Sequence, residues 1–237
     1  MIRRKLYSVK RWLTRIIERK LSKIRHQKKL KDIQKMSDFE EYVEKNQPML
    51  FTRYKEVSES KVIDFKSAID HIGIDLNEKS FLDLGPAYGD SLDVVNQRGA
   101  NRIDFTEFDP YFYTYNRLKP YTNNGYQIDH RKQLSQLPER IYDFIWCKGG
   151  ISADYFIKFH RITSLSQWLE DVERLAKSNG VIMICPGWTN DKRKRNIEDL
   201  ENNLFTKTMK KHGYQILPFI DNHNHEPDYP VTFYKKN

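Results

Sequence analysis

A regular alternation of short apolar runs with amphipathic segments, beginning near residue 80, most constrains the fold of this chain. The apolar runs are five to seven residues long and contain many β-branched and aromatic side chains, which is typical of buried strands. We predict seven strands, over residues 80–85, 102–107, 125–129, 141–147, 180–186, 214–220 and 231–236. The segments between them predict helices over residues 89–98, 110–119, 164–178 and 197–212. This order favours an α/β fold with a mostly parallel sheet and helices on both faces.

Basic charge is concentrated in the first 35 residues. They contain 14 Lys or Arg against two acids, whereas the rest of the chain carries 27 basic and 30 acidic side chains. The apolar residues of this segment recur at intervals of three and four, as on one face of a helix. They are Ile2, Leu6, Val9, Leu13, Ile16, Ile17, Leu21 and Ile24. We predict a basic amphipathic helix that packs on its own domain or on a partner protein, lies on an anionic membrane surface, or binds RNA.

These patterns predict three regions. The basic amphipathic helix covers residues 1–35, a linker and helical lead-in covers 36–77, and the α/β domain covers 78–237. The lead-in ends in a predicted helix over 60–73, which Gly73 terminates.

The cysteine content and the lack of long apolar runs indicate a cellular location. Cys147 and Cys185 each lie at or near the end of an apolar run, and we interpret both as buried thiols in a reducing compartment. No run of 18 apolar residues occurs, so no transmembrane helix is expected. We predict a cytoplasmic protein, peripheral to the inner face of a membrane through its basic helix.

The stretch FLDLGPAYGDSL joins the first predicted strand of the sheet to its first helix. Gly85 and Gly89 leave the backbone open to a ligand, and Asp83 precedes them. A dinucleotide fingerprint, G-x-G-x-x-G, would need glycine where the chain has Ala87 and again at Asp90, whose charge would repel a pyrophosphate. The turn therefore favours a ligand without a phosphate group.

LDLGPAYGDSL resembles the first motif of the class I S-adenosylmethionine-dependent methyltransferases, (D/E)-x-G-x-G-x-G. Asp83, Gly85 and Gly89 match it, and Ala87 replaces the middle glycine. Four further segments resemble later motifs of the family in the same order: FTEFDP, YDFIWCKGG, LEDVERLAKSNGVIMI and YPVTFYKK. The resemblance covers about residues 78–236. It implies a Rossmann-like seven-stranded fold, methyltransferase activity and S-adenosyl-L-methionine as the cofactor.

The resemblance also implies which residues contact the cofactor. Glu107 would accept the ribose hydroxyls, and Asp83 would lie near the methionine end or order the turn. Asp129 or His130 would lie at the edge of the adenine, and Phe108 would pack on its ring. The full set, with the last residue beside the methionine part, is Asp83, Gly85, Pro86, Ala87, Gly89, Glu107, Phe108, Asp129, His130 and Lys148.

Catalytic and acceptor-binding residues are expected after the fourth and fifth strands. A hydroxyl nucleophile benefits from a general base, and we predict Asp154 and His160 for this role, with Tyr155 positioning the acceptor. The alternative is that both lie on an ordinary helix surface. Trp188 is a candidate for stacking on a sugar or base, and Lys192–Arg195 for attracting an anion.

A polar segment over residues 221–228 separates the last two predicted strands. It contains two histidines and three carboxylates: Asp221, His223, His225, Glu226 and Asp228. Such residues bind metals in other proteins. We interpret the segment as a polar loop or a lid over the substrate, and predict no metal site.

The predicted function is methyl transfer to oxygen on a glycan, a glycolipid or another acidic small-molecule acceptor. The sequence CKGG follows the fourth strand where many amino-group methyltransferases have a tetrad like NPPY, which favours oxygen or carbon acceptors. One alternative is an RNA or nucleotide methyltransferase, although nucleic acid is less favoured because the α/β domain is nearly neutral. Another is a non-catalytic methyltransferase-like subunit that a partner protein holds by the N-terminal helix.

Overall fold

The computed structural model describes most of the α/β region and part of the N-terminal region. The described residues are 21, 24–25, 28–33, 35–46, 65–66, 68–70, 72–152, 162–187, 204–219 and 231–236. The chain divides into two compact units, residues 1–48 and residues 49–237, and each is described by itself.

The N-terminal unit is helical where it is described. The described residues between 21 and 31 have helical backbone, and α2 follows over Met36–Asn46. The buried apolar side chains are Leu30, Phe39 and Val43. Leu21 and Ile24, which belong to the predicted apolar face, are 47% and 62% exposed. The predicted division at residues 35 and 77 stays a prediction, although α2 occupies part of the region expected to be a linker.

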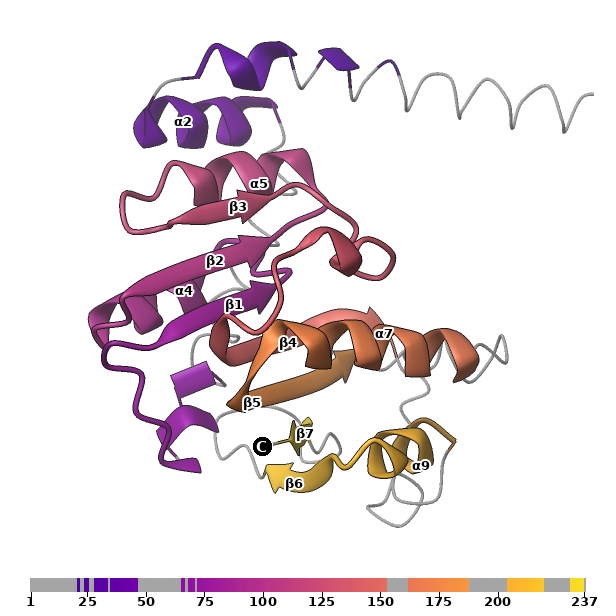
Figure 1. Cartoon of the computed structure of the whole chain (residues 1–237). Coiled ribbons are helices and arrows are strands. Elements are labelled where there is room, and N and C mark those ends of the chain that lie inside the picture. Colours follow the sequence, from indigo (N-terminus) through magenta and orange to yellow (C-terminus); the bar gives the residue numbers. More distant parts are fainter. Residues whose placement is uncertain are drawn as a thin grey trace, which may run out of the picture. The chain divides into compact units, whose positions relative to one another are not determined.

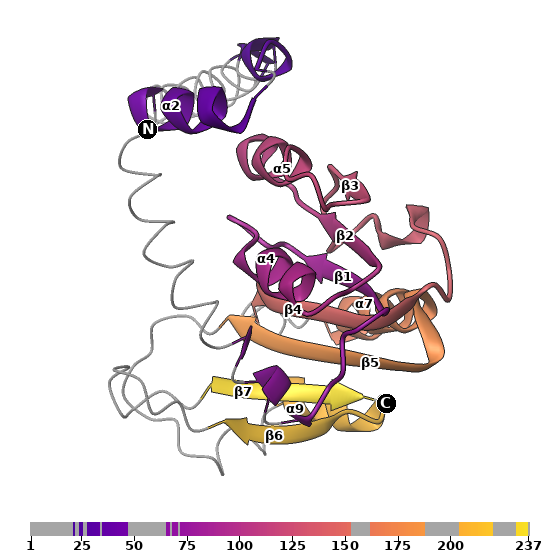
Figure 2. The same ribbon diagram turned by 90° about the vertical axis from the view of Figure 1, so that its left-hand side faces the viewer.

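The second unit contains a seven-stranded sheet in the order β3-β2-β1-β4-β5-β7-β6 (Figure 1). Its strands are β1 (Ser80–Leu84), β2 (Arg102–Thr106), β3 (Asn124–Tyr126), β4 (Tyr142–Ser152), β5 (Ala176–Gly187), β6 (Gln215–Phe219) and β7 (Val231–Lys236). Neighbours among β1 to β5 pair in parallel, whereas β7 is antiparallel to β5 and β6. Figure 2 shows the strands stacked in this order. The predicted mostly parallel, Rossmann-like fold class is confirmed.

The helix before β5 ends three residues earlier than predicted. α7 covers Ile162–Leu175, and β5 begins at Ala176, within the predicted helix 164–178. The backbone N–H groups of Arg140 and Ile141 donate to the carbonyls of Arg174 and Leu175, at 3.0 and 3.1 Å. The chain entering β4 therefore satisfies the carbonyls at the end of α7 and stops the helix there.

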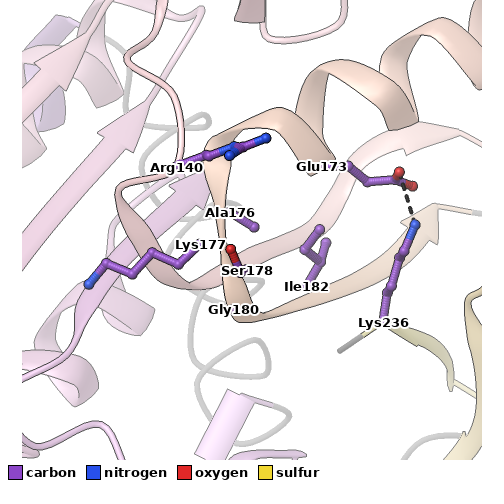
Figure 3. A pocket seen from close by; sticks show the side chains of 8 residues that line it. All are labelled: Arg140, Glu173, Ala176, Lys177, Ser178, Gly180, Ile182 and Lys236. Atoms are coloured by element: carbon purple, nitrogen blue, oxygen red, sulfur yellow. Dashed lines mark ion pairs between the residues drawn. The ribbon is translucent and has the colours of Figure 1, made fainter.

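A pocket of about 270 Å³ lies at this amino-terminal edge of the parallel strands (Figure 3). Its lining residues come from the end of α7, the start of β5, the loop before β4 and the end of β7. They are Arg140, Glu173, Ala176, Lys177, Ser178, Gly180, Ile182 and Lys236. The Lys236 ammonium pairs with the Glu173 carboxylate at 2.9 Å, drawn as a dashed line in Figure 3, and Lys177 extends away from the pocket there.

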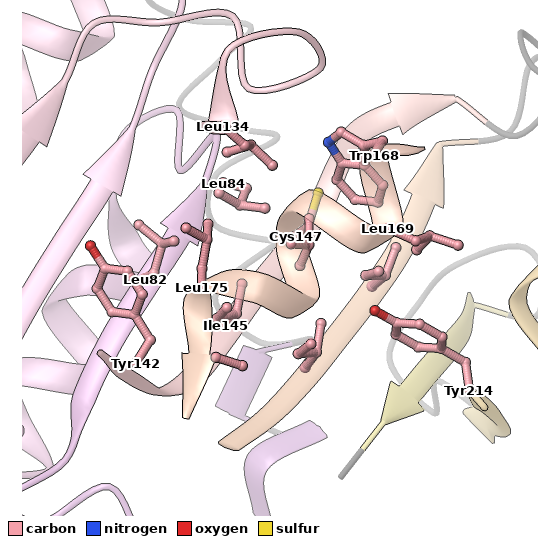
Figure 4. Packing of buried hydrophobic residues seen from close by; sticks show 14 of the residues in the cluster. Leu82, Leu84, Leu134, Tyr142, Ile145, Cys147, Trp168, Leu169, Leu175 and Tyr214 are labelled. Atoms are coloured by element: carbon pink, nitrogen blue, oxygen red, sulfur yellow. The ribbon is translucent and has the colours of Figure 1, made fainter. Parts of the chain in front are cut away.

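Helices cover both faces of the sheet. β1 shows why, because it presents apolar side chains to each face. Leu82 and Leu84 face a cluster completed by α7 and α9 (Leu204–Lys211), which Figure 4 shows from close by. Phe81 faces the other cluster, with α4 (Asp90–Gln97) and the helical residues around Phe65. The Phe65 ring lies 4.9 Å from that of Trp146. Each such buried side chain contributes about 1.5–3 kcal/mol to folding.

Smaller predictions near the sheet divide into confirmed and wrong ones. Both cysteines are buried, as expected. β3 ends at Tyr126, so Asp129 lies in a turn and not in a strand as predicted. β4 continues to Ser152, beyond its predicted end. In α5 (Pro110–Arg117) the predicted start at proline is confirmed, and Asp109 caps it by accepting from the Tyr111 N–H at 2.8 Å.

Candidate functional site at the carboxyl edge of the sheet

The turn between β1 and α4 has a left-handed backbone conformation at every second residue. Gly85, Ala87 and Gly89 have φ values of 90°, 55° and 74°, which is the left-handed region that favours glycine. The Gly85 N–H donates to the Thr106 carbonyl of β2 at 2.9 Å, so the turn is attached to the neighbouring strand. The three left-handed residues lie at the three glycine positions of the methyltransferase motif that this turn resembles. An alanine at the middle position costs about 1–2 kcal/mol relative to its preferred conformation.

α5 packs over this turn. Tyr88 lies edge-on between two rings of α5, with centroid distances of 5.1 Å to Phe112 and 5.3 Å to Tyr115. A side chain at Gly89 would overlap the amide of Asn116. Only glycine therefore fits position 89, for reasons of space as well as backbone conformation.

Asp83, at the end of β1, is buried and faces the start of α4. Its exposure is 2%, and its carboxylate accepts a hydrogen bond from the Ser91 hydroxyl. This contact attaches the first turn of α4 to the sheet. The geometry is compatible with the prediction that Asp83 orders the turn, and its predicted contact with the methionine end stays a prediction.

Glu107 follows β2 directly and is 8% exposed. Its Oε2 accepts from the Ala87 N–H at 3.2 Å and its Oε1 accepts from the Asp109 N–H at 3.1 Å. Burial raises the pKa of this carboxyl to about 7, the nearby Asp109 charge adds to the rise, and the backbone donors oppose it. No ion pair to Glu107 occurs within the described part of the chain. Each carboxylate oxygen keeps acceptor capacity for a further donor, such as a ligand hydroxyl.

Phe108 is 52% exposed, beside the carboxylate of the preceding residue. A ring exposed to this extent is not part of the hydrophobic core. Its predicted packing on adenine stays a prediction.

Asp129 and His130, in the turn after β3, are both 7% exposed. The Asp129 carboxylate already binds the Arg131 guanidinium, at 2.7 Å to Nε and 3.0 Å to Nη2, which lowers its pKa. The His130 carbonyl accepts from the Trp168 indole at 3.1 Å. An adenine contact by Asp129 would therefore share this carboxylate with Arg131.

Lys148 completes the predicted set. It lies in β4, two residues beyond Trp146, which pairs in register with Asp83 of β1. Lys148 itself pairs in register with Cys185 of β5. The structure thus brings all ten predicted cofactor residues to the carboxyl edge of β1, β2, β3 and β4. None of them lines the pocket at the opposite edge.

The predicted catalytic and acceptor residues cannot be placed in the same way. Those outside the described residues are Asp154, Tyr155, His160, Trp188, Lys192–Arg195 and the segment 221–228. Among the described residues, no group of three or more His, Cys, Asp or Glu side chains is arranged to hold a metal ion.

Two residues of this edge were missed by the sequence analysis. Asn116 is fully buried in α5 and donates from Nδ2 to the Ala87 carbonyl at 2.6 Å. Lys119 is 6% exposed, lies 2.8 Å from both oxygens of Asp93 and donates to the Gly89 carbonyl at 3.5 Å. An Asn within a helix is an unfavourable choice for the helix itself, and this is the one local signal that could have indicated Asn116.

Comparisons with known proteins support the fold and not a close relationship. No protein-family model matches the sequence, and no curated protein matches it. An S-adenosylmethionine-dependent methyltransferase from Mesorhizobium loti is 13% identical with a TM-score of 0.51, over 71% of this chain and 95% of that chain. One from Aquifex aeolicus is 14% identical with a TM-score of 0.50, over 78% and 96%. This chain has the fold of these structures.

Proposed function

We propose that this protein is an S-adenosylmethionine-dependent methyltransferase. The observation that carries the proposal is Glu107, a nearly buried carboxylate directly after β2 that accepts from the backbone N–H groups of Ala87 and Asp109, next to a turn with three left-handed residues. A carboxylate so placed is suited to accept both hydroxyls of a ribose, at about 1.5–3 kcal/mol for each charged hydrogen bond.

The residues of this edge have separable tasks. The turn over Gly85–Gly89 presents backbone in place of side chains, so a nucleoside can approach closely. Glu107 binds the sugar diol, and the exposed Phe108 ring covers an apolar surface beside it. S-adenosylmethionine, when bound, supplies a methyl group on a sulfonium, which is already a good leaving group. The chain then has to align the acceptor, and such alignment lowers a barrier by about 7–11 kcal/mol.

Titration calorimetry with S-adenosylhomocysteine tests the cofactor proposal. The wild-type protein should bind it, and Glu107→Ala should weaken binding by about tenfold or more, which is 1.4 kcal/mol. Glu139→Ala is the matched control, because Glu139 is a 62% exposed acid near the opposite edge. No binding by the wild-type protein would favour the non-catalytic subunit instead.

We further propose an oxygen atom of a glycan, a glycolipid or another acidic small molecule as the methyl acceptor. The sequence CKGG in β4 supports this, and Asp154 and His160 are the proposed bases. Transfer of a labelled methyl group to a panel of acceptors is the direct test. Activity on RNA and not on saccharides would favour the nucleic-acid alternative. Asp154→Asn and His160→Gln should each lower kcat more than they change the affinity for S-adenosylhomocysteine.

The N-terminal region supports a proposed location at the anionic inner surface of a membrane. Among the described residues, no helix is long and apolar enough to span a bilayer. Leu21 and Ile24 are exposed on a helix with a large excess of basic side chains. Each basic residue near an anionic surface contributes about 1 kcal/mol.

Sedimentation with vesicles tests this location. The full chain should bind phosphatidylglycerol vesicles and not phosphatidylcholine vesicles, and Leu21→Glu/Ile24→Glu should release it. Removal of residues 1–35 should do the same while leaving S-adenosylhomocysteine binding intact. A truncated protein that still sediments with anionic vesicles would contradict the proposal.

A further inference from the structure

In the turn over Gly85–Gly89, Ala87 has a left-handed backbone conformation, which is unfavourable for any residue other than glycine. Its φ of 55° lies between those of Gly85 and Gly89, which adopt the left-handed region freely. Contacts around Ala87 must therefore hold it in place.

Two side chains bind the two polar backbone groups of Ala87. The carboxylate of Glu107 accepts from its N–H at 3.2 Å, and Nδ2 of Asn116 donates to its carbonyl at 2.6 Å. Asn116 has no exposed surface. Because it lies 29 positions later in the chain, in α5, it attaches a separate helix to the turn.

The orientation of the Asn116 amide is fixed by its surroundings. Nδ2 donates a second hydrogen bond to the Phe112 carbonyl at 2.9 Å, so both of its N–H groups face acceptors. The reverse orientation would place an oxygen against two carbonyl oxygens. Oδ1 is buried without a hydrogen-bond partner in the described structure and occupies the space that a side chain at Gly89 would need.

We propose that Asn116 is a positioning residue for cofactor binding, which takes the place of the missing middle glycine by holding Ala87 in its left-handed conformation. The ligand in this inference is the methyl donor of the proposed function, so the inference rests on that function. Asn116 does not touch the reacting atoms. It acts through the backbone at residue 87, whose N–H also orients Glu107.

A double-mutant cycle tests this role in the full-length protein. Asn116→Leu keeps the approximate size and removes both donors, and it should weaken S-adenosylhomocysteine binding by about tenfold, or 1.4 kcal/mol. Ala87→Gly adopts the left-handed conformation without help. The double variant Ala87→Gly/Asn116→Leu should therefore recover affinity to within about threefold of the wild type.

Thr114→Val is the matched control on the same helix, because the Thr114 hydroxyl bonds the Pro110 carbonyl at 2.8 Å within α5. It should leave affinity unchanged. A folded Asn116→Leu protein with wild-type affinity, or a double variant as impaired as Asn116→Leu, would overturn the proposal. If Asn116→Leu does not fold, Asn116→Ser takes its place in the same cycle.

Melting temperatures separate this inference from the proposed function. If the wild type does not bind S-adenosylhomocysteine, the proposed function fails, and the cycle is read by thermal unfolding instead. Ala87→Gly should then raise the melting temperature more in the Asn116→Leu background than in the wild type. Equal increases would mean that Asn116 does not hold residue 87.

Discussion

Two acidic side chains, one within β2 and one directly after it, have opposite surroundings. Asp104, in the middle of the strand, has no exposed surface and is bound by three side chains and one backbone N–H. Its carboxylate lies 2.9 Å from Nε of Arg102 and accepts from the Tyr142 hydroxyl at 2.7 Å. The backbone N–H and the side-chain amide of Asn124 donate to its other oxygen, at 3.0 and 3.1 Å. The Tyr142 pKa is raised well above its usual range by burial and by the Asp104 charge.

Glu107, three residues later, is held differently. The hydrogen bonds described for it come from backbone N–H groups, at Ala87 and Asp109, and its pKa rises to about 7. A buried carboxylate whose role is structural is neutralised by a cation and by side-chain donors. A buried carboxylate that binds a ligand keeps acceptor capacity for that ligand, and its uncompensated desolvation lowers the stability of the fold. The comparison predicts that Asp104 stabilises the fold and that Glu107 destabilises it.

The largest effect is expected at Asp104. Asp104→Ala leaves the buried Tyr142 hydroxyl and the Asn124 N–H without their acceptor, and removes the partner of Arg102. The free energy of unfolding should fall by about 3–5 kcal/mol, measured by urea denaturation. Asp70→Ala is the control, because Asp70 is 61% exposed in its ion pair and should cost less than about 1 kcal/mol. Similar losses for both variants would mean that Asp104 stabilises the fold no more than an exposed acid does.

The second effect is a gain in stability when Glu107 is neutralised. Because its pKa is raised from 4.5 to about 7, the folded protein binds this proton more tightly than the unfolded chain does. The stabilising contribution is complete below about pH 4.5 and is lost as the pH rises through 7. The stability of Glu107→Gln relative to that of the wild type should therefore rise by about 3 kcal/mol between pH 4 and pH 8. The Gln side chain accepts through one oxygen only, so either the Ala87 or the Asp109 N–H loses its acceptor at both pH values, and this loss cancels in the difference.

Urea denaturation at both pH values measures this difference. Glu139→Gln, which changes an exposed acid, should show no such gain. A stability difference that stays the same between pH 4 and pH 8 would mean that the ionised Glu107 carboxylate does not destabilise the fold. The comparison with Asp104 would then fail.

The third effect concerns ligand binding. The ionised carboxylate is the better acceptor for hydroxyl donors, so S-adenosylhomocysteine affinity should increase by about tenfold between pH 6 and pH 8 as Glu107 loses its proton. The Glu107→Gln variant should bind weakly and without this pH dependence. Calorimetry at intervals of half a pH unit measures the profile. A wild-type profile that stays flat across pH 7 would contradict the assignment of this carboxyl to the ligand.

The smallest effect is expected at Ala87, next to Glu107. Ala87→Gly removes the left-handed strain of about 1–2 kcal/mol but adds backbone entropy to the unfolded chain. The net gain in the free energy of unfolding should be about 0.5–1 kcal/mol. Ala100→Gly serves as the control, since Ala100 is not among the described residues with positive φ, and it should lose stability. A loss at Ala87 as well would indicate that its conformation is not strained.

The sequence by itself determined the seven strands and their mostly parallel arrangement, and its resemblance to a known family suggested ten residues near the ends of these strands. Apolar periodicity is a local property, and strands joined by helices must run parallel, so the ends of β1 and β2 meet at one edge. Glu107 was predicted from the resemblance of FTEFDP to a methyltransferase motif, and its position directly after β2 follows from chain order.

Tertiary structure decided what no local pattern contains. The end of α7 at Leu175 depends on N–H groups from the loop before β4. The contact of Asn116 with Ala87 joins residues 29 positions apart, and the raised pKa of Glu107 results from burial by segments far from it in the chain. Hydrogen bonding and desolvation depend on which atoms lie within a few ångströms, and only the packed chain fixes those neighbours.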